Sequence, residues 1–202
     1  WTNNVCNKLK NQGCEIIISP NGSPFDKYKI NQRKKVIEDR ISEVRLPFVY
    51  VNQVGGQDEL VFDGSSHVMN ADKEIIYRSP QWEEDRAIIE FDQREKKFLS
   101  QNFVNNDLTD LENIYMATVT GLRDYVLKNR FPGVILGLSG GIDSAFCAAV
   151  AVDALGEGKV EGFMLPSIYT SQNSFDDAEE CARRLNISLE TVSYTHLRAH
   201  ET

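Results

Sequence analysis

Residues 134–192 alternate between apolar segments with strand character and segments with helical periodicity, and no other feature constrains the fold as strongly. Strands that alternate with helices form a parallel sheet, because each helix carries the chain back to the start of the next strand. We therefore predict an α/β fold here, the start of a doubly wound parallel sheet. The predicted strands are residues 134–138, 160–165 and 187–192, and the predicted helices are residues 144–155 and 175–185.

The loop after the first of these strands, SGGIDS at residues 139–144, has the composition of a phosphate-binding loop. Ligands of doubly wound sheets bind beyond the carboxyl ends of the strands, where this loop is predicted. Gly140 and Gly141 allow a sharp turn and a close approach of the backbone to a ligand. The following helix offers unpaired amides and a partial positive charge, and Ser139 and Ser144 add hydroxyl donors. The loop is predicted to bind a chain of phosphates.

Asp143 is the unusual member of this loop, because a carboxylate repels phosphates unless a cation lies between them or its oxygen caps the helix. Two interpretations remain open: Asp143 binds a magnesium ion that bridges to the phosphates, or it only caps the helix. The loop lacks the lysine of the GxxxxGK[ST] motif, so transfer of a terminal phosphoryl group is not favoured. A loop that holds the β and γ phosphates as a leaving group suits attack at the α phosphorus.

The first 92 residues have a different pattern, in which short strand-like segments are separated by Gly, Asn and Asp. One helical segment, residues 35–44, lies between the first two strands, so this part is predicted to be α+β or a layered sheet. The polar residues 93–108 are predicted to be a linker, and TDLE at residues 109–112 predicts a capping box that starts a helix ending near Lys128. The predicted strands are residues 15–19, 47–53, 59–62, 74–77 and 87–91.

Charge and hydrophobicity exclude two classes of protein. The formal net charge of −8 argues against a general nucleic-acid binder, because a phosphate backbone requires a basic face. No apolar run approaches the roughly 20 residues of a membrane helix, and residues 1–10 are no signal peptide, so a soluble protein is expected. Five basic residues form a cluster that we interpret as a solvated helix face, the less favoured alternative being that one of them meets an anionic group. They are Lys27, Lys29, Arg33, Lys34 and Lys35.

The four cysteines show no paired spacing of the zinc-binding or redox type, which favours reduced thiols and a cytoplasmic location. Cys147 and Cys181 fall on apolar helix faces and are predicted to be small core residues. Cys6 and Cys14 are predicted to be buried structural thiols.

The motifs resemble two known domain types. SGGIDS resembles the pyrophosphate loop of the N-type ATP pyrophosphatases. The sequences on either side of it resemble, more narrowly, the synthetase domain of the glutamine-dependent NAD synthetases. IIISPNGSPF and VGGQDELVFDG resemble the later part of the nitrilase-like amidase domain that precedes the synthetase domain in this family. The resemblance covers about residues 1–192. It implies the C-terminal part of a nitrilase-like αββα sandwich, followed by the start of a doubly wound sheet like that of the adenine nucleotide α hydrolases.

The resemblance implies a division into four segments. Residues 1–92 would be a partial glutaminase domain, 93–108 a linker, and 109–192 a partial synthetase domain. Residues 193–202 look like a non-native tail, and the alternative that His196, His200 and Glu201 in this tail bind zinc is not favoured.

The chemistry implied by the resemblance is a two-step ligation that needs ATP and Mg²⁺. ATP adenylates the carboxylate of nicotinate adenine dinucleotide and releases pyrophosphate, and ammonia then displaces AMP to give NAD. The ammonia comes from glutamine through a thioester on a cysteine that has glutamate and lysine partners. Trp1 matches the tryptophan of the family's CEDxW motif, so these three catalytic residues would lie upstream of Trp1 and the isolated chain is expected to be inactive. The partners would be small molecules, and a homo-oligomer is expected for the intact enzyme.

Site residues follow from the same resemblance. Met164 to Ser167 would lie near adenine, Ser23 would contact glutamine, and Lys29 would lie near the substrate carboxylate. Asp143 would bind the metal ion. The ATP-binding residues would be Gly137, Leu138, Ser139, Gly140, Gly141, Ile142, Asp143 and Ser144.

Three other interpretations compete with the resemblance to a glutamine-dependent NAD synthetase. The chain could belong to a nitrilase-like amidase whose appended α/β domain only binds nucleotide, or it could be a non-catalytic nucleotide-binding module. GMP synthetase shares the SGGIDS loop, but its glutaminase domain is organised differently and lacks GGQDELVFDG. ATP affinity without release of pyrophosphate would identify the non-catalytic module.

Overall fold

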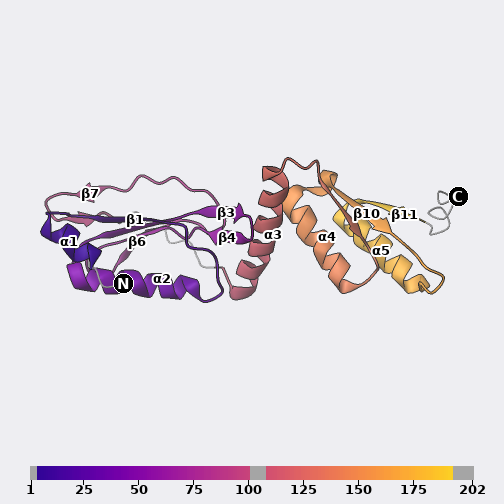
Figure 1. Cartoon of the computed structure of the whole chain (residues 1–202), viewed down its shortest axis with the longest axis horizontal. Coiled ribbons are helices and arrows are strands. Elements are labelled where there is room, and N and C mark those ends of the chain that lie inside the picture. Colours follow the sequence, from indigo (N-terminus) through magenta and orange to yellow (C-terminus); the bar gives the residue numbers. More distant parts are fainter. Residues whose placement is uncertain (1–3, 101–107, 193–202) are drawn as a thin grey trace. The chain divides into compact units, whose positions relative to one another are not determined.

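The computed structural model describes residues 4–100 and 108–192. It divides into two compact units, Trp1–Ala117 and Thr118–Thr202 (Figure 1). In the described residues, no helix combines the length and the hydrophobicity needed to cross a membrane. Trp1 and the histidines of the predicted tail lie outside the described residues.

The first unit is built on a four-stranded mixed sheet in the order β1-β2-β5-β6. Strands β1 and β2 are parallel, whereas β2 pairs with β5 and β5 with β6 in the antiparallel sense. Two separate hairpins, β3-β4 and β7-β8, are the other paired strands among the described residues of this unit. The bounds are β1 (Ile17–Asn21), β2 (Phe48–Asn52), β3 (Val54–Gln57), β4 (Leu60–Asp63), β5 (His67–Met69), β6 (Ile75–Arg78), β7 (Phe91–Asp92) and β8 (Lys97–Phe98).

Helices α1 (Val5–Asn11) and α2 (Lys29–Val44) lie on one side of this sheet, and β7 lies on the other (Figure 1). Ile37, Ile41 and Val44 recur at helical spacing on α2 and are all buried against the sheet. The helix ends where Arg45 adopts a left-handed conformation with φ 53°, two residues before Pro47. The predicted helix was therefore correct in position but began six residues too late.

One predicted strand is wrong. Residues 83–90 have no regular secondary structure, and β7 begins only at Phe91. Ile88 is 88% exposed whereas Ile89 packs against the cluster of Val68, Ile76 and Phe98, so the alternation of the sequence is real. Alternating burial alone does not make a strand, because a strand also needs a neighbour with which to form a hydrogen-bonded ladder.

The second unit contains a parallel three-stranded sheet in the order β11-β10-β9, as the alternating pattern predicted. Val160 and Met164 of β10, with Leu138 just after β9, pack against two helices that contribute mainly alanines to the core. Small side chains let these helices approach the sheet and each other closely. The bounds are β9 (Val134–Gly137), α4 (Ile142–Leu155), a short 3₁₀ helix η1 (Glu157–Lys159), β10 (Val160–Met164), α5 (Gln172–Leu185) and β11 (Ser188–Thr191).

Helix α3 (Asp110–Lys128) begins at the predicted capping box. The Thr109 amide donates to Glu112 Oε2 at 2.7 Å, and the Glu112 amide donates to Thr109 Oγ1 at 3.3 Å. The Thr109 amide, and after it the Thr109 hydroxyl at 2.8 Å, donate to this carboxylate and lower the pKa of Glu112. The two reciprocal bonds satisfy amides that would otherwise lack partners at the helix start.

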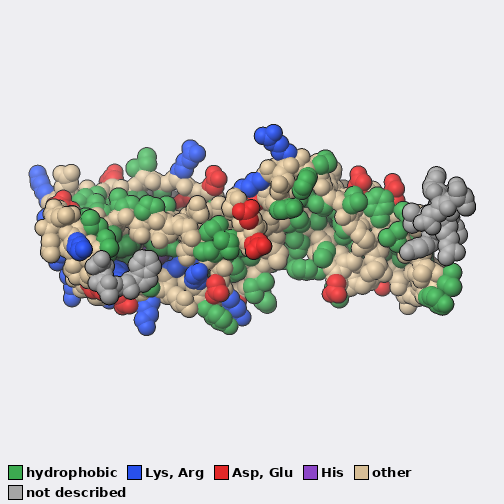
Figure 2. Space-filling model, in the orientation of Figure 1, with side chains coloured by type: hydrophobic (Ala, Val, Ile, Leu, Met, Phe, Trp, Pro, Cys, Tyr) green, Lys and Arg blue, Asp and Glu red, His purple; other side chains and the backbone are tan. Residues whose placement is uncertain are grey.

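The prediction that Cys147 is a core residue is wrong, because Cys147 is exposed on α4. Residues 145–152 are apolar without interruption, so no polar face distinguishes the buried side of this helix in the sequence. Ile142 is 81% exposed and Phe146 is 50% exposed on the same helix, and Figure 2 shows hydrophobic side chains at the surface of this unit. Cys181, in contrast, packs against the core as predicted.

Candidate functional site

The SGGIDS loop lies at the carboxyl end of β9, between that strand and α4. Gly141 is the N-cap of α4, and Ser139, Gly141 and Asp143 are exposed. The Leu138 amide donates to Phe163 O of β10 at 2.8 Å, and this bond fixes the start of the loop to the sheet. The sequence therefore forms the strand, loop and helix that were predicted, with the loop open to solvent.

Gly140 is required by both its conformation and its surroundings. Its φ is +80°, which residues with a side chain rarely adopt. A Cβ atom there would lie 2.4 Å from Ser174 O and 2.9 Å from Ser174 Cα in the first turn of α5. At Gly141 the nearest atom to a Cβ would be Ser139 Oγ at 3.3 Å, so the second glycine is less constrained.

Two serine hydroxyls hold the loop in this shape. The Ser139 amide donates to Ser144 Oγ at 3.2 Å, and the Ser144 hydroxyl donates to Gly141 O at 2.9 Å. The Gly141 amide donates to Ser139 Oγ at 3.2 Å. Ser139 Oγ also lies 3.2 Å from Ser144 Oγ, and because the Ser144 proton is donated to Gly141 O, the Ser139 hydroxyl is the donor in this contact.

The loop also offers backbone donors. Among the described residues, the amides of Gly140, Ile142, Asp143 and Ser144 donate no hydrogen bond to the protein, whereas the Ala145 amide donates to Gly141 O at 3.1 Å. Three of these four amides belong to the first turn of α4, where a helix carries a partial positive charge. An anion placed at this turn would gain several hydrogen bonds at once.

Asp143 does not cap α4. The N-cap is Gly141, and no side chain makes a capping hydrogen bond there. The Asp143 carboxylate is exposed in the first turn and has no ion pair within residues 4–100 and 108–192. The interpretation that Asp143 only caps the helix is therefore wrong.

The other residues predicted near ATP differ in how far they are accessible. Gly137 ends β9 and is exposed, but the side chain of Leu138 is 2% exposed and belongs to the core. Met164 is also 2% exposed, whereas Leu165 is 57% exposed just beyond the end of β10. Since β9 and β10 are parallel neighbours, the loop and this segment leave the same edge of the sheet.

The first unit holds a second set of polar residues, around the segment that follows β1. The Ser23 amide donates to Asn52 Oδ1 at 2.8 Å, and Arg33 Nε donates to Ser23 Oγ at 3.1 Å. Lys29 is the first residue of α2 and is half-buried, and its amide donates to Asp26 O at 3.0 Å. No contact within the described residues joins the Lys29 ammonium to Ser23.

Arg33 is buried, which corrects its assignment to a solvated helix face. It is 8% exposed and forms a bidentate ion pair with Asp63, which is fully buried, with both N···O distances 2.8 Å. The alternative of a base that meets an anionic group is thus confirmed for Arg33. A signal was present in the sequence, since residue 33 falls on the same helical stripe as Ile37, Ile41 and Val44.

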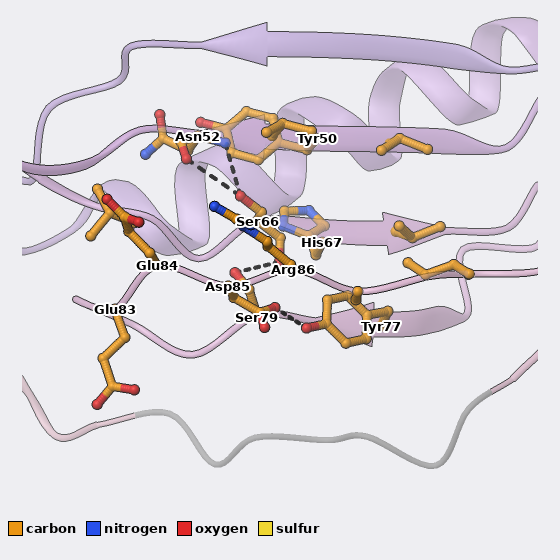
Figure 3. Close-up of a pocket in the computed structure, with 16 residues that line it drawn as sticks. Tyr50, Asn52, Ser66, His67, Tyr77, Ser79, Glu83, Glu84, Asp85 and Arg86 are labelled. Atoms are coloured by element: carbon orange, nitrogen blue, oxygen red, sulfur yellow. Dashed lines mark hydrogen bonds between the residues drawn. The ribbon is translucent and has the colours of Figure 1, made fainter.

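A cavity of 420 Å³, which no pattern in the sequence predicted, lies in this unit. Figure 3 shows on its wall Tyr50 and Asn52 of β2, His67 of β5, and Ser66, which directly precedes β5. The His67 Nδ1 lies 3.0 Å from Ser65 O, so Nδ1 carries the proton and donates. The opposite nitrogen, Nε2, is buried and has no partner in the part of the chain that the structure describes.

We expect His67 to make the stability of the chain depend on pH. Burial is the main cause that lowers its pKa below the ordinary value of 6.5, and the nearby bases Arg78, Lys34 and Arg33 act in the same direction. Because the unfolded chain binds the proton more readily, stability should fall as pH decreases through 6.5, by at most about 1.4 kcal/mol per pH unit. Urea unfolding of wild type and His67→Asn at several pH values tests this, since Asn can still donate to Ser65 O. Equal pH slopes for the two proteins would refute it.

The surroundings of the two cysteines of the first unit indicate a structural role. Cys6 and Cys14 are half-buried and pack against the core under α2. The Cys14 thiol donates to Ile16 O at 2.7 Å, and burial raises the pKa of Cys6. A raised pKa disfavours the thiolate, so Cys6 lacks the surroundings of a nucleophile.

Comparison with known proteins gives two consecutive family matches. The model of the carbon-nitrogen hydrolases matches residues 1–97, and the model of the NAD synthases matches residues 114–200. The chain is 44% identical to a glutamine-dependent NAD(+) synthetase of Rhodobacter capsulatus, over 98% of the chain and 36% of the relative. It is 40% identical to the protein of the same name from Acinetobacter baylyi, over 93% of the chain and 35% of the relative.

Solved structures agree with these matches. The glutamine-dependent NAD+ synthetase of Acinetobacter baumannii, solved in complex with ADP, superposes with a TM-score of 0.89 at 40% identity, over 98% of this chain and 38% of that one. A glutamine-dependent NAD(+) synthetase of Cytophaga hutchinsonii superposes with a TM-score of 0.72 at 19% identity, over 91% of this chain and 36% of that one, and shows the fold alone.

The chain therefore spans about a third of the length of these relatives and carries, in the predicted order, parts of two domain types. The carbon-nitrogen hydrolase part confirms the nitrilase-like half of the predicted fold, and the NAD synthase part confirms the start of the doubly wound sheet. The chain belongs to the glutamine-dependent NAD(+) synthetase family.

Proposed function

We propose that this chain contributes to the ATP-dependent amidation of nicotinate adenine dinucleotide to NAD, with ammonia taken from glutamine. The names of the relatives support the reaction, and the loop geometry supports the part that this chain plays. The single observation that carries the proposal is the set of four unpartnered amides beside Gly140, at the carboxyl edge of a parallel sheet. ADP in the Acinetobacter baumannii relative supports an adenine nucleotide as ligand.

Residues 139–144 would hold the β and γ phosphates of ATP while the substrate carboxylate attacks the α phosphorus. The departing diphosphate gains negative charge as the bond to the α phosphorus breaks. Fixed amide donors and the end of α4 stabilise that charge without rearrangement, which is the condition for effective electrostatic catalysis. On binding, the Ser139 hydroxyl would turn its proton from Ser144 Oγ, 3.2 Å away, to a phosphate oxygen. Gly137 and residues 164–167 would line the nucleotide at the same edge.

Asp143 would hold Mg²⁺ beside the phosphates. Its carboxylate is exposed, makes no capping bond and lies in the same first turn of α4 as the free amides, which is a placement that suits a bridging cation. When bound, the ion would neutralise charge on the phosphate chain. The residues of the loop would still supply the orientation, because their shape is fixed by the serine bonds within the protein.

We expect Asp143→Asn to remove most of the effect of magnesium on ATP binding. If the carboxylate bridges through the ion, calorimetric titration of wild type should show ATP affinity that increases with Mg²⁺. In the variant, this increase in affinity should be about tenfold smaller. Binding without Mg²⁺ should be unchanged or tighter, because a repulsive charge has gone. An unaltered magnesium dependence in the variant would contradict the metal role.

Ser23 and Lys29 would bind glutamine in the first unit. Ser23 presents a hydroxyl at the carboxyl end of β1, and Lys29 lies six residues later at the start of α2. In the whole protein, Ser23→Ala should raise the KM for glutamine about tenfold, the loss of one hydrogen bond to a charged group. Synthesis driven by free ammonia is measured in parallel as the report on integrity. An unchanged KM for glutamine would refute the role of Ser23.

The remaining parts of the proposal concern the setting of the reaction. We place the amidase Cys, Glu and Lys outside residues 1–202, because Cys6 and Cys14 pack against the core and burial raises the pKa of Cys6. The boundaries near residues 92 and 109, a cytoplasmic location and a homo-oligomeric enzyme are also proposed. The net charge of −8 supports small-molecule substrates over nucleic acid. Glutaminase and synthetase assays of the isolated chain should both be negative, and activity in either would contradict this placement.

A further inference from the structure

All N–H donors of the Arg33 guanidinium bond to the segment that contains Ser23 or to Asp63. Its Nε donates to Ser23 Oγ at 3.1 Å, and Nη2 donates to Ser23 O at 2.8 Å and to Pro24 O at 2.9 Å. Its Nη1 donates to the two carboxylate oxygens of Asp63, each at 2.8 Å. A guanidinium has five N–H donors, and these contacts use all of them. Arg33 therefore has no donor left for a ligand and acts only through the residues that it holds.

The backbone of Ser23 is held from a second direction by β2. The Ser23 amide donates to Asn52 Oδ1 at 2.8 Å, and Asn52 Nδ2 donates to Ser23 O at 3.1 Å. Asn52 is 6% exposed, and its own amide donates to Ser66 Oγ at 2.9 Å. Helix α2 and strand β2 thus fix the position of Ser23 together.

The bond from Arg33 also fixes the role of the Ser23 hydroxyl. A guanidinium N–H can only donate, so Ser23 Oγ is the acceptor in this contact. The hydroxyl proton must then point to another acceptor, and a carboxylate or carboxamide oxygen of a ligand is such a group. Arg33 thereby converts a hydroxyl that could donate or accept into one that donates outward.

A buried hydroxyl without a partner lies beside this arrangement. Tyr50 is 6% exposed, and its hydroxyl has no hydrogen-bond partner in the described residues. Tyr50 lies two residues before Asn52 on β2, so both side chains are on the same face of the strand, and burial raises the pKa of Tyr50 while the Arg33 charge opposes that rise. Buried polar groups are rarely left unsatisfied, and a ligand at Ser23 would supply the missing partner.

We propose that Arg33 is a positioning residue of the glutamine site, which orients the Ser23 hydroxyl as a donor and is itself held by Asp63. The inference rests on the proposed binding of glutamine by Ser23. Lysine could keep the ion pair with Asp63, but it has three donors from one nitrogen and cannot also reach Ser23 and Pro24 in this geometry. Arg33→Lys therefore separates the positioning of Ser23 from the neutralisation of Asp63.

The test is a double-mutant cycle in the whole protein. We measure KM for glutamine and kcat for Arg33→Lys, Ser23→Ala and the pair, with ammonia-driven synthesis as the measure of an intact fold. Arg33→Lys should raise KM for glutamine about tenfold in the wild-type background and by less than about twofold in the Ser23→Ala background. The matched control is Arg40→Lys on the same helix, which carries an exposed bidentate pair with Glu43 and should leave KM unchanged.

The outcomes separate this inference from the proposed function. If Ser23→Ala leaves KM for glutamine unchanged, the role of Ser23 is wrong. Suppose that Ser23→Ala raises KM for glutamine. If Arg33→Lys then has no effect on KM, or if the fold-changes of the two variants multiply in the double variant, only the positioning role is overturned. If Arg33→Lys also lowers ammonia-driven synthesis, Asp63→Glu replaces it, which keeps the charge and displaces the guanidinium. An effect of Asp63→Glu on KM for glutamine that persists in the Ser23→Ala background would overturn the positioning role as well.

Discussion

Replacing Gly140 with alanine is expected to weaken ATP binding by the chain by at least about 100-fold, equivalent to the loss of two charge-assisted hydrogen bonds. A Cβ atom at this position would lie 2.4 Å from Ser174 O and 2.9 Å from Ser174 Cα, which are backbone atoms of α5. Neither can move aside without displacing the first turn of that helix. The loop must therefore shift, and the free amides of Ile142 and Asp143 are displaced with it. Calorimetric titration with Mg²⁺ and ATP measures the effect.

Gly156→Ala is the matched control for this prediction. Gly156 has nearly the same φ, +83° against +80°, but no atom lies within 4 Å of a Cβ there. It should therefore cost about 1 kcal/mol of stability through backbone strain while leaving ATP affinity unchanged. If both variants bind ATP equally well, the approach of Gly140 to Ser174 has no bearing on the nucleotide. If both lose affinity, the effect is one of strain alone.

Replacing Asp63 with asparagine is expected to lower the free energy of unfolding by about 3–5 kcal/mol. Asp63 is fully buried, and its side chain forms both charged hydrogen bonds to Nη1 of Arg33. Without the carboxylate, the guanidinium stays buried with an uncompensated charge. The loss is a large share of the roughly 5–15 kcal/mol by which domains are stable. Urea unfolding followed by circular dichroism measures it.

Glu43→Gln breaks the corresponding exposed pair and serves as the control. Arg40 Nη1 lies 2.8 Å from Glu43 Oε2, but the side chains of Arg40 and Glu43 are 43% and 36% exposed. Solvent screens such a pair, so its removal should cost less than about 1 kcal/mol. A shift for Asp63→Asn as small as that for Glu43→Gln would mean that water or another group compensates Arg33.

The second unit could be predicted from the sequence because its signals are local. Each strand is an apolar run followed by a loop, and each helix starts and stops at recognisable residues, such as Gly156 after α4 and Asn186 after α5. Parallel pairing then follows from the alternation itself. The loop of residues 139–144 was located on the same grounds, although the packing of Gly140 against Ser174 joins residues 34 positions apart and has no local signal.

The first unit was predicted less completely because its pairings are mostly non-local. Strand β2 lies between β1 and β5, which are distant in the chain, and β5 has only three residues, all buried, so it shows no alternation. Arg33 lies on the buried stripe of α2, but it was predicted to be exposed because charged side chains are rarely buried. The ion pair with Asp63 links residues 30 positions apart, and no sequence rule indicates that partner. The predicted boundaries between the domains stay predictions.

The most direct measurement is an NMR titration of the ¹⁵N-labelled chain with ATP and Mg²⁺, in which each backbone amide reports separately. The amide signals of Gly140, Ile142, Asp143 and Ser144 should shift most and saturate together, while those of Glu157–Lys159, in the connection at the other end of α4, should shift little. Saturable binding that leaves the four loop amides unperturbed, or the absence of binding in wild type, would contradict the proposal that this loop holds the phosphates.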